Sequence, residues 1–419
     1  MLMLRVLVVL PLYGGSLPVG RFCIEGLREA GCLVESFAAP SFYGAYSALN
    51  ELKVRPDRLG ALQNSFLQVL GQAVLAKVEA FGPDLVLAMA QAPLSRVTLK
   101  RLRQDKVATA MWFVEDFRLF TYWRAFAPQY DIFAVIQKEP FLSELRAIGV
   151  DNALYLPLAA LPDFHRPLQL GPQEKKEFGA GLSFMGAGYP NRRKAFVQLR
   201  DFGLKIWGTE WDDAPLLAPL LQRGGARVSP EDCVRIYNGA DINLNLHSSV
   251  QADSLVSHGD FVNPRTFEIA SCGAFQLVDE RELLPELFSE DEMATFSDMD
   301  SLRDAIISYR QSPEKRAAMA AKARARVLAE HSYAARMRSL LDFARSRLTG
   351  FAQRKAAAWP EEMPEDMQKA MDALMHKLHL PESAGFDDIV AAVRAGNEPL
   401  DDAEAALLFL DEWRKLYLR

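Results

Sequence analysis

The sequence has few cysteines and no apolar run long enough to cross a membrane. The four cysteines are scattered, without the spacing of a metal site: Cys23, Cys32, Cys233 and Cys272. This usage is expected of an intracellular protein with free thiols, so we expect a cytoplasmic location. The apolar opening, residues 1–12, is short, contains an arginine and lacks a clean cleavage site, which favours a buried strand over a signal peptide. We therefore expect no transmembrane segment.

A strong excess of one charge is also absent. The chain has 48 Lys and Arg against 54 Asp and Glu, a formal net charge of −6. This balance argues against nucleic acid or an anionic membrane as the main partner. Half of the residues are hydrophobic and 24% are charged, as in a globular protein rather than a disordered one. A chain of 419 residues has room for two or more domains.

Strand patterns alternate with helical patterns in the first part of the chain. The predicted strands are residues 5–10, 32–38, 84–90, 107–113 and 131–136. Strands that alternate with helices predict a mostly parallel sheet with right-handed crossovers. The first strand leads into Gly14, Gly15 and Ser16, although the full dinucleotide fingerprint is missing. This glycine turn either borders a binding crevice or is only a tight turn.

Two adjacent carboxylates, Glu115 and Asp116, follow the strand predicted at 107–113. Carboxylates at the end of a strand are candidates for acid–base chemistry or for contacts with sugar hydroxyls. Asp116 could equally cap the structure that follows, and the sequence leaves the two interpretations open.

Residues 157–176 contain four prolines and no hydrophobic periodicity, which predicts a linker. We therefore predict an N-terminal domain at 1–160, a second domain at 177–348 and a helical C-terminal extension at 349–419. The second domain again alternates strands and helices. Its predicted strands are 182–186, 204–208, 241–247, 274–278 and 292–296, with a helix at 280–288 after the fourth. The predicted fold class is α/β, with two Rossmann-like, doubly wound domains.

Three basic residues, Arg192, Arg193 and Lys194, stand where the strand ending at Gly186 passes into a helix. Cations are disfavoured at a helix N-terminus unless an anion is bound there. The pattern therefore favours a phosphate site over a solvated basic surface.

The stretch 241–278 predicts a strand, a long polar loop, a short helix and another strand. Asn263, followed by proline, is a preferred helix start, and Gly273 is a preferred end. The start of such a helix offers N–H groups and a positive dipole end to a phosphate or diphosphate. Arg265 and Glu268 share a face of this helix, which would also suit an ordinary surface ion pair.

These motifs resemble those of the GT-B glycosyltransferases. The second half resembles the retaining family 4 enzymes ("glycosyl transferases group 1") and, more closely, their CgeB-type spore-maturation branch. The resemblance rests on residues 183–186 with the basic turn that follows, and on 240–247, 263–273 and 326–333. It covers residues 180–345 well and the first half loosely.

The resemblance implies a nucleotide-sugar donor site on the second domain. Glu268 matches the second glutamate of the family's Glu-x7-Glu signature and would hold the ribose hydroxyls, whereas Asp260 replaces the first glutamate. The candidate donor-binding residues are Gly186, Arg192, Arg193, Lys194, Asn245, His247, Asn263, Arg265, Thr266 and Glu268. The candidate catalytic residues are Glu115, Asp116 and Asp260. The acceptor would enter near Gly14, Gly15 and Ser16.

The expected activity is transfer of a sugar from a nucleotide-diphosphate donor to a hydroxyl of a glycan, lipid or protein, with retention. No cofactor and no metal are expected, because basic side chains and a helix start can stabilise the leaving diphosphate. The Asp298-Met299-Asp300 triplet is expected to start a helix rather than to hold a metal. Two alternatives stay open at this point: a non-catalytic sugar-nucleotide-binding or envelope- or spore-assembly protein, and a sugar-nucleotide epimerase.

Overall fold

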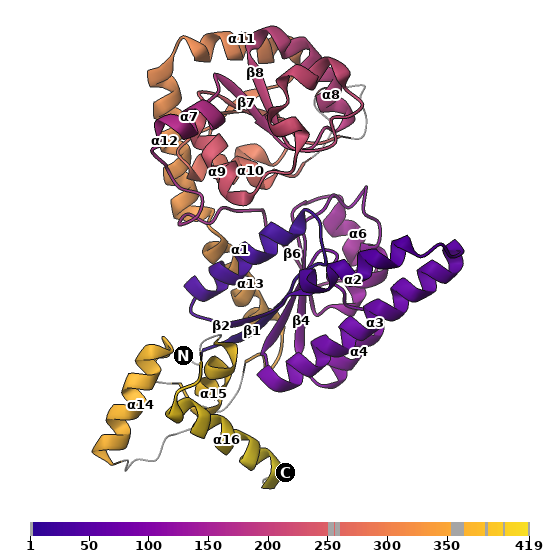
Figure 1. The fold of residues 1–419 in the computed structure, drawn as a ribbon, viewed down its shortest axis with the longest axis vertical. Coiled ribbons are helices and arrows are strands. Elements are labelled where there is room, and N and C mark those ends of the chain that lie inside the picture. The colour runs from indigo at the N-terminus through magenta and orange to yellow at the C-terminus, as the bar shows by residue number, and fades with distance from the viewer. Residues whose placement is uncertain are drawn as a thin grey trace. The chain divides into compact units, whose positions relative to one another are not determined.

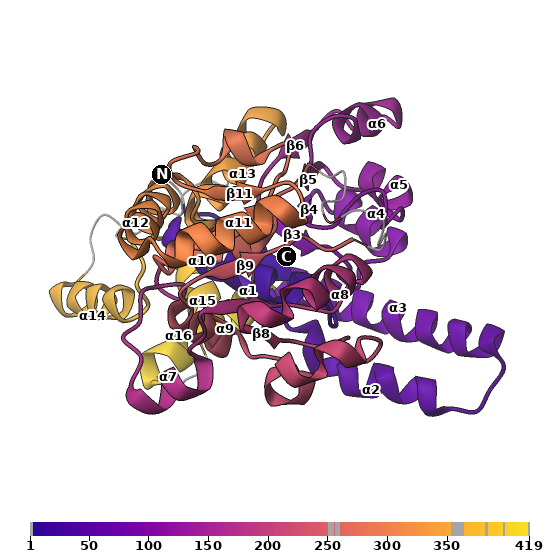
Figure 2. The same ribbon diagram turned by 90° about the horizontal axis from the view of Figure 1, so that it is seen from above.

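The computed structural model describes residues 3–249, 255, 260–352, 364–381, 384–396 and 399–417 (Figures 1 and 2). The chain forms two compact units. Unit 1 comprises Met1–Ala134, Glu144–Leu154 and Met337–Arg419. Unit 2 comprises Val135–Ser143 and Tyr155–Arg336. The two ends of the chain thus belong to the same unit, whereas the sequence predicted a separate segment for 349–419.

Unit 1 is built on a six-stranded sheet with the order β2-β1-β3-β4-β5-β6. Its strands are β1 Arg5–Val9, β2 Leu33–Phe37, β3 Leu85–Met89, β4 Ala108–Phe113, β5 Ile132–Val135 and β6 Ala153–Tyr155. β1 pairs in parallel with β2 and β3, and β3 pairs in parallel with β4. β1 and β3 are buried on both faces, which explains their continuous apolar sequences. The strand order reverses between β1 and β3, and such a switch point forms a binding crevice in doubly wound sheets.

The first part of the chain also forms helices. They are α1 Ser16–Glu29, α2 Tyr43–Ala48, α3 Pro56–Phe81, α4 Arg96–Gln104, α5 Trp123–Phe126 and α6 Phe141–Ala147. Helices α3 and α4 lie side by side (Figures 1 and 2). They approach closely at Gly71, where a Cβ atom would lie 2.5 Å from Thr98 Oγ1.

The C-terminal helices belong to unit 1, except that the first four residues of α13, Tyr333–Arg336, belong to unit 2. They are α13 Tyr333–Arg347, α14 Glu365–Lys377, α15 Phe386–Ala395 and α16 Asp402–Tyr417. Helix α15 contacts β2, and Arg5 of β1 donates from Nη2 to Asp388 Oδ1 of α15 at 2.8 Å. Both side chains of this ion pair are buried. Apolar residues join the last three helices to one another: Leu374, Met375, Ile389, Val393 and Leu407.

Unit 2 contains a five-stranded parallel sheet with the order β11-β10-β9-β7-β8. Its strands are β7 Leu182–Met185, β8 Leu204–Trp207, β9 Asn243–Asn245, β10 Gln276–Asp279 and β11 Ala294–Phe296. Counted from β7, this order repeats that of the first five strands of unit 1, and the switch point falls between β7 and β9. The predicted α/β class with two doubly wound sheets is confirmed.

The helices of unit 2 include those predicted to start at Asn263 and at the Asp298-Met299-Asp300 triplet. They are α7 Pro172–Phe178, α8 Pro190–Phe196, α9 Pro230–Gly239, α10 Pro264–Ser271, α11 Met299–Arg310 and α12 Pro313–Glu330. Asn263 caps α10 through Thr266 N–H at 3.2 Å, and Ser229 caps α9 through Asp232 N–H at 3.1 Å. Asp298 caps α11 by accepting from Ser301 N–H at 2.7 Å, so the expected helix start is confirmed.

The helix predicted at 280–288 is wrong. The segment forms only a short 3-10 turn, Leu284–Glu286, within an irregular stretch. Pro285 lies inside the segment and has no N–H to donate to a helical partner. Further 3-10 turns lie at Ala39–Phe42, Leu49–Glu51, Ala127–Gln129, Val197–Phe202, Pro215–Leu220 and Gln222–Gly225.

The predicted linker, residues 157–176, is tied to other parts of unit 2. Ala160 N–H donates to His331 O at 3.0 Å, and Tyr333 N–H donates to Ala160 O at 2.9 Å. Arg336 Nε donates to Pro157 O at 2.7 Å. The segment therefore runs through packed structure until α7 begins at Pro172.

Candidate functional site

The loops after β7 and β8 pass each other at backbone contact in unit 2. Gly186 follows β7 with φ +155°, and a Cβ atom there would lie 2.3 Å from Arg265 Nη1. A Cβ atom on Gly208, after β8, would lie 2.4 Å from Gly186 O. Glycine is therefore required at both positions to bring Arg265 and the two loops together.

Two arginines share the ring of Phe184 beside Gly186. The guanidinium carbons of Arg192 and Arg265 lie 5.0 and 5.6 Å from the ring centroid. Arg192 is buried and donates from Nη2 to Leu246 O at 2.7 Å and from Nη1 to Ala187 O at 2.9 Å. Burial and, after it, the charge of Arg265 lower the pKa of Arg192.

Arg265 makes fewer hydrogen bonds than Arg192. Its Nη1 donates to Met185 O at 2.6 Å, while its buried Nε has no hydrogen-bond partner among the described residues. Within the same part of the chain, neither Arg192 nor Arg265 forms an ion pair with a carboxylate. The two guanidinium groups at the end of β7 therefore lack a direct carboxylate partner among the described residues.

The other basic residues of the predicted turn point elsewhere. Arg193 Nη1 pairs with Asp213 Oδ2 at 2.5 Å, and Lys194 is exposed. Arg192 alone among the three turns into the interior. Successive residues point in different directions on a helix, so three consecutive basic residues cannot all face one ligand.

Four of the predicted donor-binding residues bind one another at the start of α10. Asn245 Nδ2 donates to Thr266 Oγ1 at 2.9 Å, and Asn263 Nδ2 donates to Asn245 Oδ1 at 2.8 Å. Asn263 N–H donates to His247 Nε2 at 2.8 Å. All four side chains are buried, and they fix the position of α10 relative to the ends of β9 and β10.

His247 is neutral in this network. Burial lowers its pKa to about 4. Its Nε2 accepts from Asn263, so the ring proton is on Nδ1 and is donated to Asp279 Oδ1 at 2.6 Å. His247 thus positions α10 with both nitrogens.

The start of α10 offers fewer backbone donors than a bare helix end. Pro264 has no N–H, and the N–H of Thr266 is taken by the Asn263 cap. The positive charge at this end of unit 2 therefore comes mainly from the arginine side chains.

Glu268 lies one turn after Arg265 and is 14% exposed. Its Oε2 accepts from Tyr237 Oη at 3.1 Å, and its Oε1 lies 3.9 Å from His165 Nε2. Burial raises the pKa of Glu268 to about 7, with Tyr237 and then Arg265 opposing the rise. Burial lowers the pKa of His165 to about 3, so this ring is neutral. The carboxyl group therefore stands close to its protonation midpoint at neutral pH.

Asp260 is buried, and its Oδ1 accepts from Gln137 Nε2 at 2.7 Å and from Phe261 N–H at 3.0 Å. It ends the long polar loop predicted between strand and helix. Most of that loop, residues 250–254 and 256–259, lies outside the described residues.

The predicted residues of unit 1 gather at its own switch point. Gly14, with φ +103°, places its Cα so that a Cβ atom would lie 3.7 Å from Gln91 Oε1, beyond β3. Gly15 precedes α1 as its N-cap residue, and Ser16 Oγ donates to Ala90 O at 2.9 Å. Gln91 Nε2 donates to Glu115 Oε1 at 2.5 Å. The structure thus brings the turn after β1, the end of β3 and the end of β4 together.

The two carboxylates after β4 have different surroundings. Glu115 Oε2 accepts from Tyr122 Oη at 2.7 Å, and burial raises its pKa. Asp116 Oδ1 accepts from Arg118 N–H at 2.8 Å, so it stabilises the turn that follows. Sequence reasoning missed Gln91 and Tyr122. The position of Gln91, directly after the strand across the switch point from β1, was the available signal.

Comparison with known proteins finds similarity to glycosyltransferase-like proteins. Residues 192–342 match the model of the family described as "Glycosyl transferase-like". The chain is 29% identical over 259 residues to spore protein CgeB of Bacillus subtilis (strain 168), an alignment that covers 59% of this chain and 78% of the relative. These matches support a GT-B glycosyltransferase of the CgeB type.

Solved structures agree on the fold. Sucrose-phosphate synthase (tll1590) from Thermosynechococcus elongatus is 13% identical with a TM-score of 0.54, covering 82% of this chain and 98% of that one. Anabaena Alr3699/HepE, solved in complex with UDP-glucose, is 12% identical with a TM-score of 0.55, covering 82% of this chain and all of the other. These similarities support the GT-B architecture of the glycosyltransferase.

Two further properties of the glycosyltransferase concern metals and membranes. Among the described residues there is no group of three or more His, Cys, Asp or Glu side chains placed to hold a metal ion. In the same ranges no helix is both long and apolar enough to cross a membrane. Sequence reasoning also missed Tyr237 and His165, which lie beside Glu268 and carry no motif of their own.

Proposed function

We propose that this glycosyltransferase transfers a sugar from a nucleoside-diphosphate donor to a hydroxyl acceptor, with retention and without a metal ion. The observation that carries the proposal is the pair of guanidinium groups, Arg192 and Arg265, beside Gly186. Their position at the switch point of unit 2 is where doubly wound sheets bind nucleotides. Related support comes from the HepE structures, which were solved with UDP and with UDP-glucose.

The charge of these arginines suits the departure of a nucleoside diphosphate. Two cations over one ring repel each other, and Arg192 is held in place by carbonyl oxygens rather than by a carboxylate. A bound diphosphate would compensate both charges, and Arg265 Nε has a hydrogen to donate. One preorganised donor aimed at developing negative charge lowers an activation barrier by about 3–4 kcal/mol. This charge makes a metal ion unnecessary in the proposed mechanism.

Glu268 is proposed to bind the ribose of the donor. It lies on α10 one turn beyond Arg265, so a nucleotide whose phosphates meet Arg265 can extend its sugar toward Glu268. A carboxylate accepts hydrogen bonds from two vicinal hydroxyls. Tyr237 holds the carboxyl with a hydrogen bond from the protein side, and the neutral His165 ring lies beside it.

The proposed retention follows from the resemblance of residues 263–273 to the retaining family 4 enzymes. Asp260 would contact the transferred sugar, and Glu115 would act on the acceptor side. The anomeric configuration of the first product, read by proton NMR before mutarotation, tests this point directly. An inverted product would contradict it.

The diphosphate site is tested by titration calorimetry with UDP as the probe. Arg265→Gln removes a charged donor and should weaken UDP binding roughly 10- to 100-fold. Arg193→Gln is the matched control, because this neighbouring arginine is paired with Asp213. Thermal melting verifies that both variants fold. Equal affinities in the wild type and Arg265→Gln would place the diphosphate elsewhere.

The ribose contact is tested with two ligands. Glu268→Ala should weaken binding of UDP but leave binding of inorganic diphosphate nearly unchanged, because only UDP has ribose hydroxyls. An equal loss for both ligands would show that Glu268 acts on the phosphate site.

A further inference from the structure

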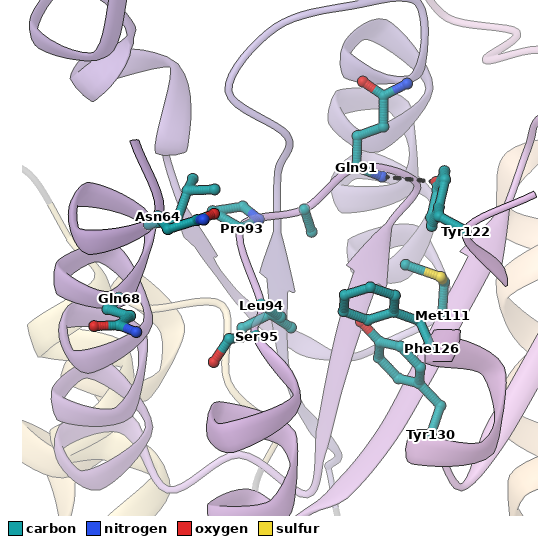
Figure 3. A pocket seen from close by; sticks show the side chains of 12 residues that line it. Asn64, Gln68, Gln91, Pro93, Leu94, Ser95, Met111, Tyr122, Phe126 and Tyr130 are labelled. Atoms are coloured by element: carbon teal, nitrogen blue, oxygen red, sulfur yellow. Dashed lines mark hydrogen bonds between the residues drawn. The ribbon is translucent and has the colours of Figure 1, made fainter. Parts of the chain in front are cut away.

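Unit 1 contains a pocket of about 460 Å³ that none of the proposed donor chemistry uses (Figure 3). It lies between α3, the loop that follows β3, and the segment from β4 to the start of β5. Much of its lining is apolar, including Leu67, Leu94, Met111 and Phe126. Pockets of this size and lining bind small organic molecules.

A buried hydroxyl lies in the wall of this pocket. Tyr130 is 6% exposed, and its Oη has no hydrogen-bond partner among the described residues. Burial raises the pKa of Tyr130, so the hydroxyl keeps its proton and can donate or accept. A buried polar group without a partner costs about 1–3 kcal/mol. A ligand oxygen that reached Tyr130 would recover this cost.

The same pocket adjoins the carboxylate at the switch point of unit 1. Gln91 and Tyr122 line it, and both also donate to Glu115. Figure 3 shows Gln91 and Tyr122 at one end, with Phe126 and Tyr130 farther along. A molecule in the pocket can therefore lie with one end at Tyr130 and the other at Gln91 and Tyr122, the two residues that contact Glu115.

We propose that this pocket binds an apolar ring bearing an oxygen substituent, and that the ring is part of the acceptor molecule. The assignment to the acceptor rests on the proposed transfer function. A dry cavity of about 150 Å³ holds one benzene ring, so this pocket has room for a fused ring system with a substituent. The ring occupies the apolar lining, its oxygen pairs with Tyr130, and the hydroxyl that receives the sugar faces Glu115.

The binding site is tested with 2-naphthol and naphthalene as probes, by titration calorimetry on the full chain. 2-Naphthol should bind saturably and more tightly than naphthalene, since only 2-naphthol has an oxygen for Tyr130. Tyr130→Phe should weaken 2-naphthol roughly 3- to 10-fold and leave naphthalene unchanged. An absence of saturable binding, or an equal loss for both probes, would overturn the proposal.

A second variant, at an exposed position, tests the same pocket without changing a buried residue. Gln68 is an exposed residue of α3 that lines the pocket, and Gln68→Trp should abolish 2-naphthol binding. Val69→Trp is the matched control, because Val69 is the next residue of α3, is 64% exposed and does not line the pocket. Equal 2-naphthol affinity in the two variants would contradict the site.

Inhibition of sugar transfer by 2-naphthol tests whether the pocket binds the acceptor. 2-Naphthol should inhibit transfer of label from a radiolabelled nucleotide sugar to acceptors in a cell extract. The concentration for half inhibition should rise in Tyr130→Phe by the same factor as the dissociation constant. Binding of UDP should be unchanged by 2-naphthol and by Tyr130→Phe, so failure here is distinct from failure of the donor site. Binding of 2-naphthol without inhibition would overturn the acceptor assignment.

Discussion

The carboxyl group of Glu268 is largely buried and has no direct ion-pair partner among the described basic side chains other than the neutral His165. Tyr237 donates one hydrogen bond to it, and Arg265 acts on it only at longer range. Its pKa is raised because the ionised form is costly to bury, so its protonation depends on how deeply the carboxyl group is buried.

The stability of unit 2 should therefore depend on pH through Glu268. Its pKa is about 7 in the folded state against 4.5 as the reference value. Below pH 4.5 the group is protonated in both states, and between these values only the unfolded state loses its proton. Stability thus falls as pH rises through this window, by about 3 kcal/mol in total.

Urea unfolding of the wild type and Glu268→Gln at pH 5 and pH 8 measures this effect. The variant should gain on the wild type by about 2–3 kcal/mol between the two pH values. Glu290→Gln, at an exposed position, is the control and should show no such gain. A constant difference between wild type and Glu268→Gln would show that Glu268 is ionised throughout.

Residue types at strand ends were predictable from the sequence, but their partners were not. Asn245, His247, Asn263 and Thr266 were all predicted as donor-binding residues, and the structure shows them bound to one another. A polar side chain after a strand can contact a ligand, or it can form hydrogen bonds that position the next helix. The spacing of such residues along the sequence is the same in both cases. Only the three-dimensional register of β9 with β10 decides between them.

Elements with a local start signal were predicted best. Helices α9, α10 and α11 begin at side-chain caps within the sequence itself. The short elements α2, α5, α6 and β6 were missed, because four- to seven-residue helices and a three-residue strand are too short to show a period. Their conformation depends on packing rather than on local pattern.

The contact between the end of β7 and α10 requires glycine at position 186, because Arg265 occupies the space where a Cβ atom would lie. Gly186→Ala would place a Cβ atom 2.3 Å from Arg265 Nη1 and displace this guanidinium. We expect UDP binding to weaken roughly tenfold, as for loss of one charge-assisted hydrogen bond. Gly203→Ala is the control, since Gly203 also has positive φ, at +61°, but has open space around its Cα.

Calorimetry with UDP compares the two alanine variants. Both should lose some stability from the backbone strain, about 1–2 kcal/mol. Only Gly186→Ala should lose affinity. Unchanged UDP binding in this variant would mean that Arg265 is not held by the end of β7 for ligand binding.

At the scale of the whole molecule, the C-terminal segment completes unit 1. Asp388 pairs with Arg5 and also accepts from Gly385 N–H at the start of α15. Removing one member of a buried ion pair leaves the other charge uncompensated, which typically costs 3–5 kcal/mol. The first strand and the C-terminal helices should therefore unfold together.

Asp388→Ala should lower the free energy of unfolding by about 3–5 kcal/mol in urea titrations followed by circular dichroism. Asp387→Ala is the control, because Asp387 is 52% exposed and pairs with Arg414 at the surface. Its loss should cost at most about 1 kcal/mol. Similar losses in both variants would show that the C-terminal helices contribute little to unit 1.

The proposed charge arrangement also predicts how the whole enzyme responds to loss of metal ions. The Asp298-Met299-Asp300 triplet serves the fold, because Asp298 caps α11. In the proposed mechanism Arg192 and Arg265 stabilise the leaving diphosphate instead. Turnover should therefore persist in excess EDTA.

Transfer of label from a radiolabelled nucleotide sugar, with cell extract as the source of acceptor, measures this turnover. Replacing both aspartates, Asp298→Asn with Asp300→Asn, should lower the melting temperature slightly through the helix cap and leave the rate nearly unchanged, whereas Arg265→Gln should lower the rate strongly. Activity that EDTA abolishes and manganese restores would mean that a metal ion, rather than the arginine pair, neutralises the diphosphate. In that case the loss in Arg265→Gln should also be small, because the charge on which the leaving group depends would come from the ion.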